Sequence, residues 1–129
     1  MTAGALSRDV HGVIISGLCR DLPEHSLLRF PVFSRGHSTL GQSPFTRPLA
    51  VQIPLLIKPI PEGCGLPAVE VRPGDWIVAD RDGVVVVPRE MGERVVQVAT
   101  VGREVDEMCM RDIRSGVGVK EAFKRHRGK

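Results

Sequence analysis

Residues 69–90, VEVRPGDWIVADRDGVVVVPRE, constrain the fold of this chain more than any other passage. The Pro-Gly-Asp sequence at 73–75 predicts a turn, and the apolar run WIVAD that follows predicts a strand. Asp82 and Gly83 form a pair typical of a tight hairpin turn, and VVVVP predicts the returning strand. An unbroken run of valines favours a strand that is covered on both faces.

A long helix is predicted after this hairpin. From residue 90 onward, apolar side chains recur every three to four residues, at Val95, Val98, Val101, Val105 and Met108. This spacing places them on one face of an amphipathic helix that ends near Gly116 and Gly118. Strands followed by such a helix indicate an α/β fold with a mixed or antiparallel sheet at its core.

The first half of the chain predicts shorter elements. The opening residues are typical of the end of a helix that leads into a strand, VIISG. LPEHSLLRF predicts a short helix with Pro23 in its first turn and Leu27 and Leu28 facing inward, and FPVFSRG predicts a strand. Residues 37–68 are rich in Pro, Gly and Ser, which predicts loops with one or two edge strands such as LAVQIPLLI, since Pro54 excludes a central strand.

Length and composition bound the class of protein. A chain of 129 residues fits one domain, residues 1–129, and 42% hydrophobic with 26% charged residues is typical of a globular protein. The apolar runs are too short and interrupted to span a bilayer, and no signal peptide is recognisable. Cys19, Cys64 and Cys109 are widely spaced without a C-x-x-C pair. This favours reduced thiols and a cytoplasmic location over a disulfide framework or a zinc site.

The net charge of +3 comes mainly from a basic C-terminal tail, residues 120–129, KEAFKRHRGK. Such a tail can contact nucleic acid. The alternative is the solvated, frayed end of a last helix, where cations suit the helix dipole. No nucleic-acid-binding motif accompanies the tail and stacking aromatic residues are scarce, so a nucleic-acid partner is disfavoured.

Arg20 and Asp21 are the strongest candidates for chemistry. They follow an apolar strand almost at once, and strand ends in α/β folds often carry functional side chains. A carboxylate there can ligate Mg²⁺ or Mn²⁺, which prefer oxygen ligands and keep several waters. The adjacent guanidinium offers a planar fork for a carboxylate or an enolate oxygen. The alternative is a loop ion pair in which Asp21 caps the following helix.

For the other polar groups, a purely structural role explains the sequence as well as a functional role does, or better. Asp75, Asp80 and Asp82 lie in or beside turns, where Asp forms local backbone hydrogen bonds. The loop Arg35-Gly36-His37-Ser38 could bind an anion or simply be solvated.

Two further kinds of side chain are weaker candidates. His25 and His37 could act as bases, although a lone loop histidine usually has no such role. Glu104 and Glu107, with Arg103 and Arg111, form an ordinary solvated helix face by spacing alone.

Three motifs in order resemble the RraA-like family. They are GVIISGLCRD, FPVFSRGHST and PGDWIVADRDGVVVVP, followed by a helix with the pattern R-E-x-x-E-x-x-x-R at residues 103–111. The family groups the regulator-of-ribonuclease-activity A proteins with class II 4-hydroxy-4-methyl-2-oxoglutarate/4-carboxy-4-hydroxy-2-oxoadipate aldolases. The resemblance covers nearly the whole chain, and RGHSTLGQSPFTRP is most similar to the fungal branch.

The resemblance implies a swivelling β/β/α-type fold, assembled as a homotrimer or hexamer with active sites between subunits. The implied chemistry is metal-dependent cleavage of 4-hydroxy-2-oxo acids to pyruvate, with decarboxylation of oxaloacetate through the same enolate. Asp21 is implied to hold Mg²⁺ or Mn²⁺, and Arg20 to bind the small 2-oxo acid substrate and act in catalysis. Glu107 matches a helix glutamate that reaches a neighbouring subunit's site, while Asp75, Asp80 and Gly83 match the hairpin and are kept as structural.

This chain differs from the family at its N-terminus, and the difference raises an alternative hypothesis of function. Family members carry a further half-domain upstream, with a Gly-rich loop that holds the pyruvate carboxylate, so we expect this chain to be an N-terminally truncated, C-terminal portion. Activity is then in question, and the rival hypothesis is a non-catalytic interaction protein of the ribonuclease-inhibitor type, or an inactive fragment.

Overall fold

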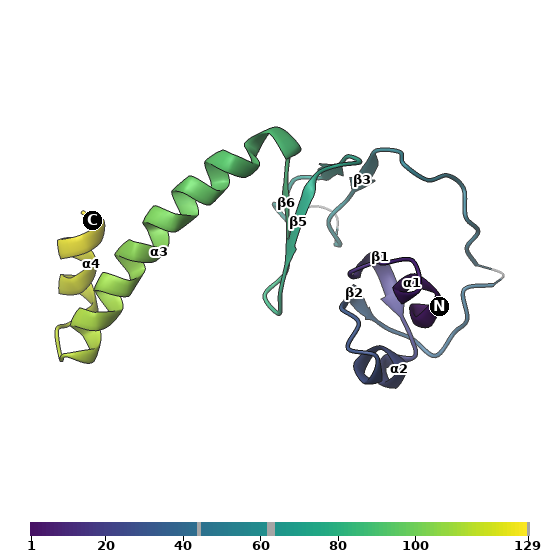
Figure 1. Ribbon diagram of the computed structural model, residues 1–129, viewed down its shortest axis with the longest axis horizontal. Helices are drawn as coiled ribbons and strands as arrows, with labels where there is room; N and C mark the ends of the chain where they lie inside the picture. The colour runs from purple at the N-terminus through teal and green to yellow at the C-terminus, as the bar shows by residue number, and fades with distance from the viewer. Residues whose placement is uncertain (44, 62–63, 129) are drawn as a thin grey trace. The chain divides into compact units, whose positions relative to one another are not determined.

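The computed structural model describes residues 1–43, 45–61 and 64–128 (Figure 1). The chain divides into two compact units, one comprising residues 1–73 and 77–86 and the other residues 74–76 and those from 87 onward. Both helices and strands are present, so the predicted α/β class is confirmed. The assignment of residues 1–129 to a single domain stays a prediction.

The first unit opens with two strands joined through a short helix. Its elements are α1 (Thr2–Leu6), β1 (Val13–Cys19), α2 (Leu22–Leu27) and β2 (Val32–His37). β1 and β2 pair in parallel, with Val13 opposite Val32 and Cys19 opposite His37. Parallel strands need a crossover connection, and α2 supplies it. Phe30, at the end of this crossover, is buried.

The rest of the first unit contains two further strand pairs. The strands are β3 (Leu55–Ile57), β4 (Val69–Val71), β5 (Trp76–Ala79) and β6 (Val84–Val87), where Trp76 and Val87 belong to the second unit. β3 and β4 pair antiparallel, and β5 and β6 are the two strands of the predicted hairpin. The amide of Asp80 donates to the carbonyl of Gly83 at 3.0 Å and closes the hairpin turn.

Three local predictions are corrected. Leu27 is 83% exposed and does not face inward, whereas Leu28 is half-buried, because a helix of six residues has too few turns for its periodicity to fix a face. The predicted strand LAVQIPLLI is reduced to β3, which begins directly after Pro54, a residue with no amide to donate. Val84 and Val85 are exposed, so at these positions the described residues of the first unit do not cover both faces of β6.

The second unit is a helical hairpin. It contains the 3-10 helix η1 (Arg89–Met91), the long predicted helix α3 (Gly92–Arg114) and α4 (Val119–Arg127). α3 ends before Gly116, whose φ of 97° suits glycine. Of the predicted apolar face, Val105 and Met108 are half-buried, whereas the valines nearer the N-terminus of α3 are exposed.

The structure describes the basic tail through residue 128, and Lys129 lies outside the described residues. α4 turns back alongside α3 (Figure 1), and Cys109 and Ala122 are buried between the two helices. The described part of the tail is therefore a packed helix and not a frayed end. Among the described residues, no helix combines the length and apolar character needed to cross a membrane.

Candidate functional site

Arg20 and Asp21 occupy the turn between β1 and α2, as the sequence predicts. Asp21 has φ 63° and ψ 36°, in the left-handed region. This conformation costs an L-residue about 1–2 kcal/mol, although Asp tolerates it better than most. A backbone held there must be fixed by its surroundings. The turn is therefore a constrained position for both side chains.

The two side chains form an ion pair at the surface of the first unit. Nε of Arg20 donates to Oδ2 of Asp21 at 3.2 Å, and the side chains are 53% and 54% exposed. A pair this exposed contributes only about 0–1 kcal/mol to folding. In the part of the chain that the structure describes, Asp21 stands at the N-cap of α2 but its side chain makes no capping hydrogen bond. The ion-pair alternative is thus present, the capping alternative is not, and both groups stay accessible to a ligand.

The backbone on either side of the pair is tied to neighbouring elements. The carbonyl of Cys19 accepts a hydrogen bond from the amide of Ser38 at 2.8 Å, which joins the ends of β1 and β2. Ser38 Oγ accepts from the amide of Leu40 and starts the loop after β2. A Cβ added at Gly41 would lie 3.5 Å from Nη1 of Arg20. This loop therefore passes beside the guanidinium group.

His25 is a weak candidate by sequence, but in the structure it makes two side-chain hydrogen bonds beside the Arg20–Asp21 turn. Its Nε2 lies 2.7 Å from the carbonyl oxygen of Arg20, and its Nδ1 lies 2.7 Å from Oγ1 of Thr2, which is buried. The contact with Thr2 spans 23 residues, and a histidine amid polar residues gives no sequence signal of either contact. His25 therefore links α1, α2 and the Arg20–Asp21 turn.

Arg35 is committed to structure. Its Nε and Nη2 donate to Oγ of Ser16 at 3.2 and 3.1 Å, and Nη2 also donates to the carbonyl of Lys58 at 2.6 Å. These bonds tie β2 to β1 and to the segment after β3. The anion-binding alternative for the loop at residues 35–38 gains no support from this geometry. His37, at the end of β2, is exposed.

Of the acidic residues at 75, 80 and 82, Asp80 forms the local hydrogen bonds that the structural alternative predicts, and Asp75 bonds a more distant amide. Oδ1 of Asp80 accepts from the amides of Asp82 and Gly83 at 2.8 and 3.3 Å. Oδ1 of Asp75 accepts from the amide of Arg89 at 3.3 Å and so joins the turn before β5 to η1. The carboxylates of Asp80 and Asp75 therefore have structural hydrogen-bond partners.

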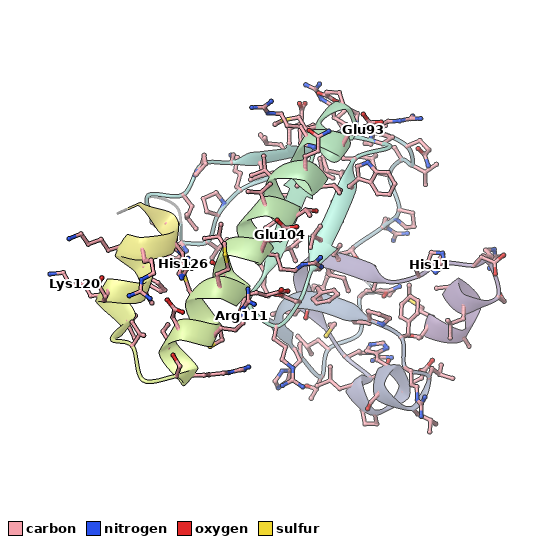
Figure 2. The ribbon with its side chains drawn as sticks, turned by 60° about the vertical axis from the view of Figure 1, so that its left-hand side comes forward. His11, Glu93, Glu104, Arg111, Lys120 and His126 are labelled. Atoms are coloured by element: carbon pink, nitrogen blue, oxygen red, sulfur yellow. The ribbon has the colours of Figure 1, made fainter. Side chains whose placement is uncertain are left out.

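Glu104 and Glu107 lie on α3, in the second unit, and Figure 2 shows Glu104 and Arg111 on this helix. Oε1 of Glu107 is 3.9 Å from Nε of Arg103, and both side chains are largely exposed. The contact is a loose pair one helical turn apart and contributes little to stability. Arg20 and Asp21 thus lie together in the first unit, and Glu107 belongs to the other.

A tighter charged cluster holds α3 and α4 together. Oδ2 of Asp112 accepts from Nη1 of Arg125 and from Nε2 of His126, each at 2.9 Å (His126 is labelled in Figure 2). The hydrogen bond from His126 most strongly lowers the pKa of the Asp112 carboxyl below its ordinary 3.8, partial burial opposes this, and the charge of Arg125 adds to the lowering. Arg127 also donates to Oδ1 of Asp106 at 2.6 Å and lies over the ring of Phe123.

The described residues contain no group of three His, Cys, Asp or Glu side chains that could hold a metal ion. Asp21 is a single half-exposed carboxylate. Mg²⁺ is commonly held by one or two carboxylates together with waters and substrate oxygens, so the donor chemistry of Asp21 fits such an ion as one ligand among several.

The hollows of the first unit lie elsewhere. A groove of about 1020 Å³ is lined by β1 to β6, with apolar residues such as Ile14, Leu55, Val69 and Val85. A shallower hollow of about 270 Å³ lies beside α2 and includes His25 and Phe30. Arg20 and Asp21 line neither, which is consistent with their position on an exposed turn.

Comparisons with known proteins agree with one another. The family model RraA-like (Aldolase/RraA) matches residues 1–86. A protein of Halalkalibacterium halodurans named "Putative 4-hydroxy-4-methyl-2-oxoglutarate aldolase" is 34% identical over 114 residues, 88% of this chain and 50% of that protein. Protein DlpA of Legionella pneumophila is 28% identical over 95% of this chain and 18% of its own length.

The fold has a solved counterpart. The crystal structure of an uncharacterized protein from Pseudomonas syringae pv. tomato superimposes with a TM-score of 0.81 at 32% identity, covering 95% of this chain and 56% of that one. An uncharacterized protein of Methanocaldococcus jannaschii is 30% identical over 90% of this chain and 51% of its own length. The chain thus spans about half the length of most of these relatives.

Proposed function

The chain belongs to the RraA-like family, and from this membership we propose that it cleaves 4-hydroxy-2-oxo acids, of the 4-hydroxy-4-methyl-2-oxoglutarate type, to pyruvate in a divalent-metal-dependent reaction. One observation carries the proposal. Arg20 and Asp21 place a guanidinium and a carboxylate side by side on a constrained, exposed turn. In the described structure the Asp21 carboxylate does not cap α2, and an exposed ion pair adds little to the free energy of folding. Stability therefore does not account for a carboxylate at this position.

Arg20 would act on the oxygens of the substrate. In the cleavage, the 4-hydroxyl loses a proton and its oxygen forms a C=O bond to C4, so the C4 side of the substrate leaves as a carbonyl compound. The bond between C3 and C4 breaks, and its electron pair passes toward C3 and the 2-oxo oxygen. Protonation at C3 then gives pyruvate. A guanidinium beside the 2-oxo oxygen or the carboxylate orients the substrate and stabilises this developing charge. Oxaloacetate decarboxylation delivers the electron pair to the same atoms, so we propose it as a second reaction of the site.

Asp21 would hold the metal, in part through water. A bound Mg²⁺ or Mn²⁺ supplies Lewis-acid polarisation of the 2-oxo group. Asp21 would contribute an oxygen ligand from a half-exposed side chain, and its left-handed backbone sets the direction of the Cα–Cβ bond that carries the carboxylate. Arg20 donates to Oδ2, and Oδ1 takes no part in that pair.

Glu107 is the proposed second catalytic residue. We place it in the site of a neighbouring subunit of a homotrimer or hexamer, where a carboxylate can accept or return a proton. Its loose pairing with Arg103 supports this role, since a side chain 3.9 Å from its partner is easily released.

The test is pyruvate release from 4-hydroxy-4-methyl-2-oxoglutarate and from oxaloacetate, with Mg²⁺ and then with EDTA. We expect metal-dependent turnover that falls about 100-fold in Asp21→Asn, a change of charge without a change of shape. Asp9→Asn is the matched control, because Asp9 also has a positive φ, 56°, in the same unit. Wild-type turnover in Asp21→Asn, or turnover that persists in EDTA, would contradict the proposal.

A non-catalytic interaction protein of the ribonuclease-inhibitor type is the second candidate. The observation that favours it is the apolar groove of about 1020 Å³ in the first unit, where side chains such as Leu55 and Val85 are more than half exposed. Exposed apolar surface of this kind is typical of an interface. A folded, monodisperse protein without metal-dependent turnover, in which Leu55→Asp abolishes inhibition of a ribonuclease, would favour this candidate.

A further inference from the structure

The peptide plane between Arg20 and Asp21 is held by a side chain. The Arg20 carbonyl oxygen, which belongs to this plane, lies 2.7 Å from Nε2 of His25. Because a carbonyl only accepts, Nε2 carries the proton. In the neutral ring Nδ1 is then an acceptor, and the Thr2 hydroxyl donates to it at 2.7 Å. Thr2 is 4% exposed, so the far end of this chain of hydrogen bonds is anchored inside the unit.

The neighbouring carbonyls are held in a different way. The Cys19 carbonyl accepts from the Ser38 amide, and the Asp21 carbonyl accepts from the Glu24 amide at 3.0 Å and from the His25 amide at 3.3 Å. These bonds are made by backbone amides, so they are available to almost any sequence. The bond to the Arg20 carbonyl comes from an imidazole and depends on the identity of residue 25.

This bond bears directly on the geometry of the candidate site. The amide nitrogen of Asp21 lies in the same peptide plane as the Arg20 carbonyl, and φ of Asp21 is the rotation about the bond that leaves that nitrogen. Fixing the carbonyl direction therefore limits φ of Asp21, which is 63°. If the plane turns, the guanidinium and the carboxylate change direction relative to each other, although neither side chain has been altered.

We propose that His25 is a positioning residue that links α1 to the Arg20–Asp21 turn and sets the direction in which the two side chains meet their ligand. The proposal rests on the proposed function for its kinetic consequences. Its structural consequence, the left-handed φ of Asp21, is independent of any activity.

Two near-isosteric variants separate the two hydrogen bonds. The amide nitrogen of His25→Gln overlays Nε2 and can still donate to the Arg20 carbonyl, whereas the amide of His25→Asn overlays Nδ1 and keeps only the contact with Thr2. We expect the Asn variant to lose about 10- to 100-fold in Mn²⁺ affinity and in kcat/KM for pyruvate release, as loss of an orienting partner usually causes. We expect the Gln variant to stay near the wild type in both.

The scalar coupling of the Asp21 amide, measured by NMR, reports φ without reference to catalysis. We expect it to change in His25→Asn and to be retained in His25→Gln, with circular dichroism confirming that both are folded. If the wild type releases no pyruvate, the proposed function fails, and the coupling still decides the role of His25. An unchanged coupling in His25→Asn, or an equally large change in His25→Gln, would overturn the positioning role. Either result would mean that the hydrogen bond to the Arg20 carbonyl does not set φ of Asp21 and that His25 contributes only by packing.

Discussion

Asp21 and Asp112 are both carboxylates that pair with arginine, but the two units of the molecule use them in opposite ways. Asp21 contacts the residue directly before it in sequence, at 3.2 Å, and both side chains are half-exposed. Asp112 on α3 receives hydrogen bonds from Arg125 and His126 on α4, each at 2.9 Å, and its side chain is 25% exposed.

The difference distinguishes a structural charge from one that is available for chemistry. Two donors from another helix converge on Asp112, lower its pKa and join two elements, so its charge is used in folding. The Arg20–Asp21 pair joins nothing beyond two adjacent residues, and its exposure leaves it accessible. A carboxylate with a weak internal partner on a constrained backbone is the one expected to meet a ligand.

Glu107 provides the sharpest test, because it shares a helix with Asp112 but is paired even more loosely than Asp21, at 3.9 Å against 3.2 Å. If weak pairing marks a functional carboxylate, Glu107→Gln should lower kcat/KM for pyruvate release by about 100-fold, the usual contribution of a general acid or base. Glu104→Gln, three residues away on the same helix, is the matched control and should retain activity. Equal activity of the two variants would remove Glu107 from the proposed site.

Arg20→Lys tests the other half of the pair. Lysine keeps the charge but lacks the planar fork, so we expect kcat/KM to fall about tenfold, equivalent to one charge-assisted hydrogen bond. Arg125→Lys makes the same change beside the structural carboxylate, and we expect it to leave kcat/KM unaltered. A wild-type rate in Arg20→Lys would mean that the guanidinium serves only as a charge, and a loss in Arg125→Lys would break the comparison.

The elements governed by local chemistry were predictable from sequence. Apolar spacing predicts α3, and the Asp82-Gly83 pair predicts the hairpin, whose turn Asp80 closes through its own side chain. Arg20 and Asp21 were located because they closely follow the apolar run that predicts a strand at VIISG, which the structure extends to Cys19. Spacing left their chemistry open, and the proposed chemistry comes from the resemblance to the RraA-like family, of which the family match shows the membership alone.

Contacts between distant segments were not predictable. His25 reaches Thr2, 23 residues away, and Arg35 reaches Ser16 and Lys58, 19 and 23 residues away, without any periodic signal. The prediction that β6 is covered on both faces was wrong at its first two valines for a related reason. Valines predict a strand, but whether Val85 is covered depends on what packs against it, which the strand's own sequence does not encode.

The smallest expected effect concerns acid stability and leaves catalysis aside. The folded-state pKa of Asp112 is lowered, chiefly by the hydrogen bond from His126, so its contribution to stability is present above the unfolded pKa of about 3.9 and is lost as pH falls through the folded value. We expect Asp112→Asn to have a lower Tm than the wild type at pH 7. We expect this difference in Tm to become smaller as pH falls from 5 toward about 2.

Thermal unfolding followed by circular dichroism, with Asp9→Asn as the control for removal of one negative charge, measures this difference directly. Pyruvate release at pH 7 should be the same in Asp112→Asn as in the wild type, since Asp112 serves the α3–α4 pairing. A Tm gap that stays constant with pH would show that the carboxylate is not held in its charged form by α4. A Tm gap that closes at low pH, together with unchanged turnover, would place Asp112 with the structural charges and uphold its contrast with Asp21.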